Sequence, residues 1–120
     1  MKPDLTTYLG KRVRVTIDRP LGSRHPQHAD IVYPVNYGYL PNTVSGDGMP
    51  IDAYLLGVDE PLAEAEGLVV AVIIRSDDTE DKLVVAPEGR SFTGDEIETL
   101  VAFQERYFAS RIVVKRGRET

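Results

Sequence analysis

The sequence predicts a mainly β protein, a small barrel with one α-helix appended near its C-terminal end. Three observations predict this class. Short runs rich in β-branched residues recur along the chain, glycine and proline separate them, and one stretch with helical periodicity follows. Five or six short strands joined by such turns favour a barrel over a layered α/β sheet. At 120 residues we expect a single domain over 1–120, since the chain can bury one core but not two.

The first two predicted strands lie in the N-terminal third of the chain. Within residues 8–19, residues 11–18 alternate polar and apolar side chains, which is the period of a strand with one buried face. A proline ends this run, and the prolines, glycine and histidines of residues 20–30 predict a loop. Residues 31–40 predict a second strand, kinked at its proline and glycine.

Three further runs predict the rest of the sheet. Residues 53–58 form an apolar strand, and the acidic residues 59–67 predict a solvated surface connection. Residues 68–75 are nearly all apolar and β-branched, which is typical of a central strand buried on both faces. A turn rich in aspartate then leads into residues 83–86, so that the two runs predict a hairpin.

The helix is predicted from its capping signal and its apolar face. Thr93 and Glu96 form a T-x-x-E capping box, and apolar residues then recur at helical spacing, which predicts a helix over 94–109 that packs on the sheet. Residues 112–114 predict a short last strand, and residues 115–120 a frayed basic tail.

Composition limits the classes of function. The chain has no cysteine, so disulfides and thiolate metal sites are excluded. It shows no signal peptide and no apolar run long enough to span a membrane, so we expect a cytoplasmic protein without a membrane partner. Acidic residues outnumber basic ones 19 to 14, and the net charge of −5 argues against a nucleic-acid binder.

Residues 45–52 carry the first candidate site. Gly46 and Gly48 allow a tight turn around Asp47, and Asp52 follows at the mouth of the next strand. Two carboxylates presented together suit a hard cation such as Mg²⁺. The alternative is an ordinary turn, in which the aspartates cap backbone N–H groups.

A second acidic group lies in the hairpin turn. Asp77, Asp78, Glu80 and Asp81 precede Lys82 within six positions. Such a turn could contribute further oxygen ligands to a cation. The alternative is a hairpin tip that is acidic only because it is solvated.

The loop of residues 20–30 contains the remaining polar candidates. His25 and His28 are three apart, which would suit a metal pair on a helix, but the neighbouring prolines make exposed loop histidines the better interpretation. Arg24 is a candidate for binding phosphate because a guanidinium matches phosphate oxygens. A solvated surface arginine is the alternative.

Taken together, the stretch YPVNYGYLPNTVSGDGMPIDAYLL, residues 33–56, resembles the soluble (family I) inorganic pyrophosphatases. That family carries a YP-x-NYGY segment followed by an acidic loop of pattern D-G-D-P-x-D. The similarity continues more weakly through residues 75–87 and the last helix. It implies a closed five-stranded OB-like barrel with one C-terminal helix. It also implies hydrolysis of inorganic pyrophosphate by metal-activated water, Mg²⁺ (or Mn²⁺) as cofactor, a small phosphate substrate and a homo-oligomer.

The resemblance also implies a set of site residues. The implied catalytic residues are Asp47, Asp52 and Lys82, the last of which neutralises phosphate. Lys82, Tyr37 and Tyr107 would bind substrate, with Arg24 added by position only; a core tyrosine is the alternative for Tyr37 and Tyr107. The implied metal ligands are Asp47, Asp52, Asp77, Asp78 and Asp81. Two of these assignments stay open, since Glu80 can replace Asp81 and only one of Asp77 and Asp78 need bind.

Two positions depart from the family pattern. Met49 stands where the pattern has its middle aspartate, the residue assigned to general-base work on the attacking water, and a thioether cannot take a proton. Phe108 stands where a lysine follows the tyrosine of the last helix. We therefore expect slow hydrolysis. The alternatives are a hydrolase of another phosphoanhydride on the same scaffold and a non-catalytic module that binds metal or phosphate.

Overall fold

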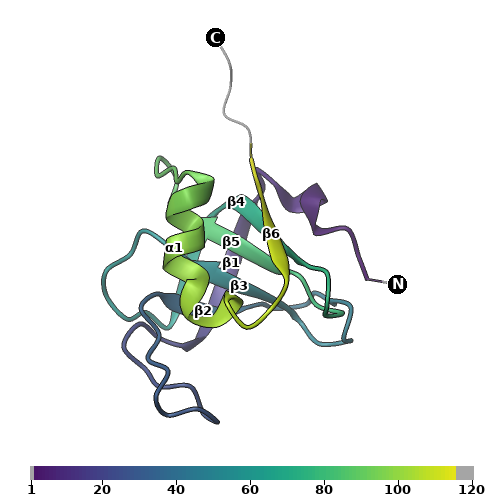
Figure 1. Ribbon diagram of the computed structural model, residues 1–120. Helices are drawn as coiled ribbons and strands as arrows, with labels where there is room; N and C mark the ends of the chain where they lie inside the picture. Colours follow the sequence, from purple (N-terminus) through teal and green to yellow (C-terminus); the bar gives the residue numbers. More distant parts are fainter. Residues whose placement is uncertain (1, 116–120) are drawn as a thin grey trace.

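The computed structural model describes residues 2–115, which form six strands and one α-helix after a short 3-10 helix (Figure 1). In chain order the elements are η1 (Leu5–Tyr8), β1 (Arg12–Arg19), β2 (Asn36–Leu40), β3 (Ile51–Leu55), β4 (Glu64–Arg75), β5 (Lys82–Ala86), α1 (Gly94–Glu105) and β6 (Ser110–Val114). The sheet runs in the order β1-β2-β3-β5-β4-β6, and β1 also pairs with β4. This pairing closes five strands into a barrel, and β6 extends the sheet beyond β4.

The predicted fold is confirmed as a mainly β, closed five-stranded barrel with one helix near the C-terminus. The barrel is mixed, because β3 and β5 run parallel while the other pairs are antiparallel. Within residues 2–115, no helix combines the length and the apolar character that crossing a membrane would require.

Strand β4 begins earlier than the sequence predicted. Its first residues were expected to be a solvated connection, but Glu64 and Glu66 lie in the strand, opposite β1. Arg14 and Arg12 stand across from them, at 3.4 Å (Arg14 Nη1 to Glu64 Oε1) and 3.6 Å (Arg12 Nη1 to Glu66 Oε1). The prediction of a linker over 59–67 is therefore wrong for its last residues, because a charged run pairs as a strand when opposite charges lie on the neighbouring strand, here at diagonal positions.

Alternating residues of the strands fill two separate cores. In β2, β3, β4 and β5 one face points into the barrel, and residues of the other face pack in a second cluster with α1, with Tyr54 and Val84 in the same cluster as Ile97 and Val101. The barrel interior is filled by aliphatic side chains, among them Val15, Ile17, Leu40, Leu55, Val69, Val72, Leu83 and Val85. The predicted packing of the helix on the sheet follows from the second core.

The helix begins as predicted and ends earlier. The Thr93 hydroxyl accepts the Glu96 N–H at 3.1 Å, and the Glu96 carboxylate accepts the Thr93 N–H at 2.8 Å, which completes the capping box. The helix ends at Glu105 rather than 109, because residues 106–109 turn the chain into β6, which itself starts two residues before its predicted bound. The predicted basic tail beyond residue 115 lies outside the described residues.

Strands β2 and β3 also differ from their predicted bounds. The second strand starts at Asn36 rather than residue 31, and Val32 instead forms an isolated bridge with Arg24 inside the preceding loop. The third strand occupies Ile51–Leu55 rather than 53–58.

Gly38 marks the point where β1 and β2 approach each other most closely. A Cβ at this position would lie 1.8 Å from the carbonyl oxygen of Thr16. We expect Gly38→Ala to lower the free energy of unfolding by about 3 kcal/mol or more, because the backbone of a barrel strand would have to move. Gly94→Ala is the matched control, since its Cβ would meet only Val114 at 3.6 Å and alanine suits a helix. Urea denaturation of both variants checks the prediction, and equal costs would contradict it.

Candidate active site

A pocket of about 470 Å³ opens where the loop of residues 20–31, the β4–β5 turn and the C-terminal end of α1 meet. In Figure 1 the helix ends at the same side of the barrel from which the loop after β1 extends. Strand ends contribute Asp18 and Arg19 from β1, Tyr37 from β2, Asp52 from β3 and Lys82 from β5. The pocket therefore gathers several predicted site residues that are far apart in the sequence.

The acidic loop is a rigid turn. The Ser45 N–H donates to the Met49 carbonyl at 2.7 Å, and the Gly48 N–H returns to the Ser45 carbonyl at 3.0 Å. Gly48 has φ +82°, which explains the glycine. Asp47 Oδ1 accepts the Ser45 hydroxyl at 2.7 Å and the Met49 N–H at 2.9 Å. Met49 itself is 62% exposed, so its side chain lies at the surface of the turn.

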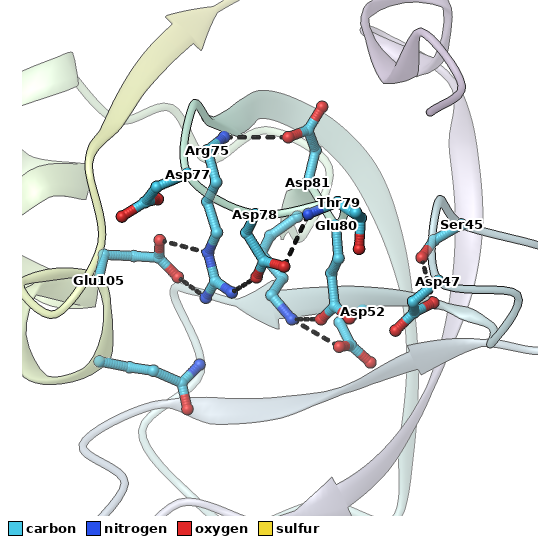
Figure 2. A network of polar contacts seen from close by, with 12 residues as sticks. Ser45, Asp47, Asp52, Arg75, Asp77, Asp78, Thr79, Glu80, Asp81 and Glu105 are labelled. Carbon is cyan, nitrogen blue, oxygen red and sulfur yellow. Dashed lines mark hydrogen bonds and ion pairs between the residues drawn. The ribbon is translucent and has the colours of Figure 1, made fainter. Parts of the chain in front are cut away.

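Asp47, Asp52 and Glu80 form a group that we call the carboxylate cluster (Figure 2). Lys82 holds it from one side: its Nζ donates to Asp52 Oδ2 at 2.6 Å and also to Glu80 Oε1. Figure 2 shows the Glu80 carboxylate directed toward Asp52, with Asp47 beside them. The cluster thus joins residues of the acidic loop, β3 and the β4–β5 turn.

The three carboxyl groups have divergent pKa values. Burial, together with hydrogen bonds to Asp52 and Asp47, raises the pKa of Glu80 to about 8. Hydrogen bonds from Glu80 and Ser45 lower the pKa of Asp47 to about 2. Burial acts to raise the pKa of Asp52, but the hydrogen bond from Glu80 and the charge of Lys82 offset it, so this pKa is lowered. With a pKa of about 8, the Glu80 carboxyl group keeps its proton at neutral pH, beside the ionised Asp52 and Asp47.

The donor set fits a hard divalent cation. Carboxylate oxygens are the ligands that Mg²⁺ prefers, and a cation beside Glu80 would stabilise its ionised form against the effect of burial, which now keeps it protonated. As they stand, residues 2–115 hold no three acidic, histidine or cysteine side chains arranged closely enough to bind a metal ion directly. Binding would require Glu80 to lose its proton and the Lys82 ammonium to turn away from the cluster.

The other acidic residues of the turn lie apart from the carboxylate cluster. Asp81 is buried, and its Oδ1 accepts Lys2 Nζ at 2.8 Å and the Arg75 N–H at 2.9 Å. Asp78 Oδ2 accepts Arg75 Nη1 at 2.9 Å, and Asp77 Oδ2 accepts the Ala109 N–H at 3.1 Å. Glu80 rather than Asp81 is the turn residue next to Asp52, so metal binding by Asp77, Asp78 and Asp81 stays a prediction.

A buried ion pair underlies the pocket and was missed by the sequence reasoning. Arg75 Nε and Nη2 donate to the two oxygens of Glu105 at 3.0 and 2.6 Å, and both residues are almost fully buried. The Tyr54 hydroxyl donates to Glu105 Oε2 at 2.6 Å, and the Phe108 ring centroid lies 3.6 Å from the Arg75 guanidinium carbon. Two features of the sequence could have predicted this ion pair. Glu105 lies four residues after Val101, on the buried side of α1, and Arg75 ends the apolar strand β4.

Tyr37 lies between two cations. Its ring centroid is 5.7 Å from the Arg19 guanidinium and 5.6 Å from Lys82 Nζ. Its burial and the neighbouring Asp52 and Glu80 raise the pKa of Tyr37 well above its usual range, so the hydroxyl stays protonated. It can therefore donate a hydrogen bond into the pocket.

Arg19 rather than Arg24, the arginine that the sequence suggested for binding phosphate, lies in the pocket. Arg19 lines the pocket, and its Nη1 donates to the Tyr33 hydroxyl at 2.6 Å. Arg24 does not line the pocket; its Nη1 donates to the Ala29 carbonyl at 2.7 Å. Tyr107 lines the pocket with 58% of its surface exposed. Arg19 directly follows Asp18 at the end of a strand, which was the signal for it in the sequence.

Part of the tyrosine-rich motif is structural. The Asn36 side chain is fully buried, and its Oδ1 accepts the N–H groups of Leu21 at 2.9 Å and Leu62 at 3.3 Å. Its Nδ2 donates to the Glu60 carbonyl at 2.9 Å. This one side chain fixes two loops against β2 and so holds the pocket wall.

Comparison with known proteins identifies the family. The family model described as inorganic pyrophosphatase matches residues 10–113. An inorganic pyrophosphatase of Xylella fastidiosa (strain 9a5c) is 38% identical over 69 residues, covering 52% of this chain and 37% of the relative. The soluble inorganic pyrophosphatase 2 of Chlamydomonas reinhardtii is 29% identical over 96 residues, covering 70% of this chain and 50% of the relative. The chain thus spans half or less of the length of these curated relatives.

Solved structures agree on the fold. The crystal structure of inorganic pyrophosphatase from Ehrlichia chaffeensis matches with a TM-score of 0.68 at 19% identity, over 89% of this chain and 88% of that one. An inorganic pyrophosphatase from Neisseria gonorrhoeae matches with a TM-score of 0.63 at 21% identity, over 94% and 88%. The resemblance seen in residues 33–56 is confirmed by the family match over most of the chain. The chain belongs to the inorganic pyrophosphatase family, as a distant member.

Proposed function

We propose that this chain hydrolyses inorganic pyrophosphate to two phosphates in the pocket described above, with Mg²⁺ as cofactor. The observation that carries the proposal is the carboxylate cluster, held beside Lys82. Asp52 and Glu80 of this cluster line the same pocket as Arg19, while Asp47 lies outside its lining. Carboxylate oxygens that lie near the two cations Lys82 and Arg19 suit a reaction that needs both a metal ion and a phosphate anion. Family membership supports the same reaction.

Asp47, Asp52 and Glu80 would hold the cation. When bound, Mg²⁺ would supply charge neutralisation and would make water more acidic. Mn²⁺ has the same preference for oxygen ligands and is expected to substitute. Asp52 is the charged member of the cluster that contacts both Glu80 and Lys82. Once the Lys82 ammonium is released from the carboxylates, it is free to neutralise a phosphate oxygen.

Arg19 and Tyr37 would hold the leaving phosphate. A guanidinium binds phosphate oxygens with two parallel hydrogen bonds, and the protonated Tyr37 hydroxyl adds a third donor. Tyr107 stands at the rim and can contact the substrate from the helix side. Met49 lies at the surface of the turn and offers no base, so we expect slow turnover, since a general base contributes about 10²–10⁴-fold. A cytoplasmic location and a homo-oligomeric state remain predictions from the sequence.

Two neighbouring substitutions test which turn residue serves the cation. We expect Glu80→Gln to lower the rate of phosphate release by about 10- to 100-fold and to weaken Mg²⁺ activation, because glutamine removes one charged ligand. Asp81→Asn is the matched control. It lies beside Glu80 but contacts Lys2 and the Arg75 backbone, so it should cost about 1 kcal/mol of stability and leave the rate unchanged.

Phosphate release from pyrophosphate is measured for both variants across Mg²⁺ concentrations. Loss of activity in Asp81→Asn with retention in Glu80→Gln would contradict the assignment of Glu80.

A further inference from the structure

The pocket has a second half that the proposed reaction does not use. Its volume, about 470 Å³, lies in the range of sites that hold drug-sized organic ligands. His25, His28, Asp30 and Ile31 line it from the loop after β1, and Phe108 lines it just after the end of α1. Inorganic pyrophosphate has no apolar part to place against such walls.

The side of the pocket formed by His25, His28 and Ile31, which we call the wall, belongs to a hydrogen-bonded hairpin loop. The His25 N–H donates to the Ile31 carbonyl at 2.9 Å, and the Ile31 N–H donates to the His28 carbonyl at 2.9 Å. Arg24 pairs with Val32 at its base. The loop therefore presents its rings in a defined arrangement.

The rings of this wall lie close together, with His25 and His28 tilted by 49° to each other. The centroids of His25 and His28 are 5.0 Å apart, and His25 is nearly parallel to Tyr33, at 12° and 6.2 Å. Partial desolvation and the charge of Arg19 lower the pKa of His25, so its ring is neutral at pH 7. Aromatic ring faces suit stacking on a planar group.

The ion pairs of the pocket also favour a ligand with an organic group. Arg75 is paired with Glu105 and Asp78, and Lys82 with Asp52 and Glu80. Arg19, by contrast, makes its one side-chain hydrogen bond within residues 2–115 to the Tyr33 hydroxyl. Of the arginine and lysine side chains that line the pocket, Arg19 is the one without an ion pair among residues 2–115, and the carboxylates of Asp18 and Asp30 line the pocket as well. This balance of charge suits a phosphate group of lower charge that also bears an organic substituent.

We infer that the pocket accepts a diphosphate with a planar organic group, of the nucleoside diphosphate class, whose ring lies against His25, His28 and Ile31. This inference rests on the proposed function. Water would add its oxygen to the terminal phosphorus, the bridging P–O bond would break, and the organic monophosphate would leave with its electron pair. The products are the organic monophosphate and inorganic phosphate, with one proton released to solvent.

The test compares three probes in the presence of Mg²⁺: inorganic pyrophosphate, adenosine diphosphate and dimethylallyl diphosphate, whose organic group is aliphatic. Equilibrium binding is measured by calorimetry and turnover by phosphate release, for the wild-type chain, His28→Ala, Ile31→Ala and the control Val44→Ala. Val44 is 67% exposed and lies outside the pocket. We expect adenosine diphosphate to bind more tightly than the other two probes. His28→Ala and Ile31→Ala should each weaken the binding of adenosine diphosphate by about 5-fold or more, which is within the effect of losing one stacking contact. Neither substitution should change the binding or turnover of pyrophosphate.

The two readouts separate this inference from the proposed function. Adenosine diphosphate that binds at the wall and is hydrolysed, while pyrophosphate releases no phosphate, would support the inference and overturn the proposed function. Pyrophosphate turnover without binding of adenosine diphosphate would do the reverse. Adenosine diphosphate that binds without being hydrolysed would overturn the hydrolytic step of the inference. Tighter binding of dimethylallyl diphosphate, or equal losses in Val44→Ala and the wall variants, would also overturn the inference.

Discussion

Asp52→Asn is expected to reduce metal-dependent phosphate release from pyrophosphate by at least about 10²-fold, the scale on which catalytic groups contribute. Asp52 lies at the start of β3, where its Oδ2 accepts Lys82 Nζ at 2.6 Å and where Glu80 contacts it. Asparagine preserves the size of the side chain and its capacity for hydrogen bonds, but removes the charge that a cation needs. The loss should therefore appear as weaker Mg²⁺ activation as well as slower turnover.

Asp59→Asn is the control for this experiment, since Asp59 is an exposed carboxylate in the connection after β3. It should retain wild-type activity. Thermal unfolding of both variants verifies that each is folded. An Asp52→Asn variant with full activity would remove Asp52 from the mechanism.

The second large effect is expected in stability rather than in catalysis. Glu105→Gln should lower the free energy of unfolding by about 3–5 kcal/mol, because it leaves the buried Arg75 guanidinium without its charged partner. The geometry is bidentate, and the pKa of Arg75, which burial alone would lower, is raised by its contact with Glu105. Tyr54 also loses a charged acceptor for its hydroxyl.

A double-mutant cycle isolates this ion pair. Arg75→Met and Glu105→Leu should each destabilise the chain, whereas the two together should recover most of the loss, because a buried pair is often replaceable by apolar side chains. Glu98→Gln, at an exposed position of the same helix, should change stability by less than about 0.5 kcal/mol. Urea denaturation measures all four variants. Additive single effects would show that the pair is not coupled.

The fold was predictable because its signals are local. The alternation of residues 12–17, the apolar run of β4 and the capping box at Thr93 each report their own element. What could not be predicted is which side chains meet across the barrel. Glu64 and Glu66 are solvated as expected, but they were assigned to a connection rather than to β4, because their arginine partners on β1 lie about fifty residues earlier in the chain.

In the candidate site, too, the local motif was predictable from the sequence, whereas contacts between distant residues were not. The positions of Asp47, Asp52 and Lys82 followed from the motif, and the structure brings Asp52 and Lys82 into contact. The choice between Glu80 and Asp81 depended on which side of the β4–β5 turn each faces, and short turns do not reveal this from their sequence. Arg19 and Arg24 differ in the same way, because a hydrogen bond to Ala29 inside the loop holds the latter away from the pocket.

The rate of phosphate release from pyrophosphate as a function of Mg²⁺ concentration tests the central claim most directly. The account predicts no release in the absence of Mg²⁺, a rate that rises to saturation as the carboxylate cluster binds the cation, and loss of that rate when a chelator is added. A folded wild-type chain that releases no phosphate at any Mg²⁺ concentration, or releases it equally with the chelator present, would contradict it.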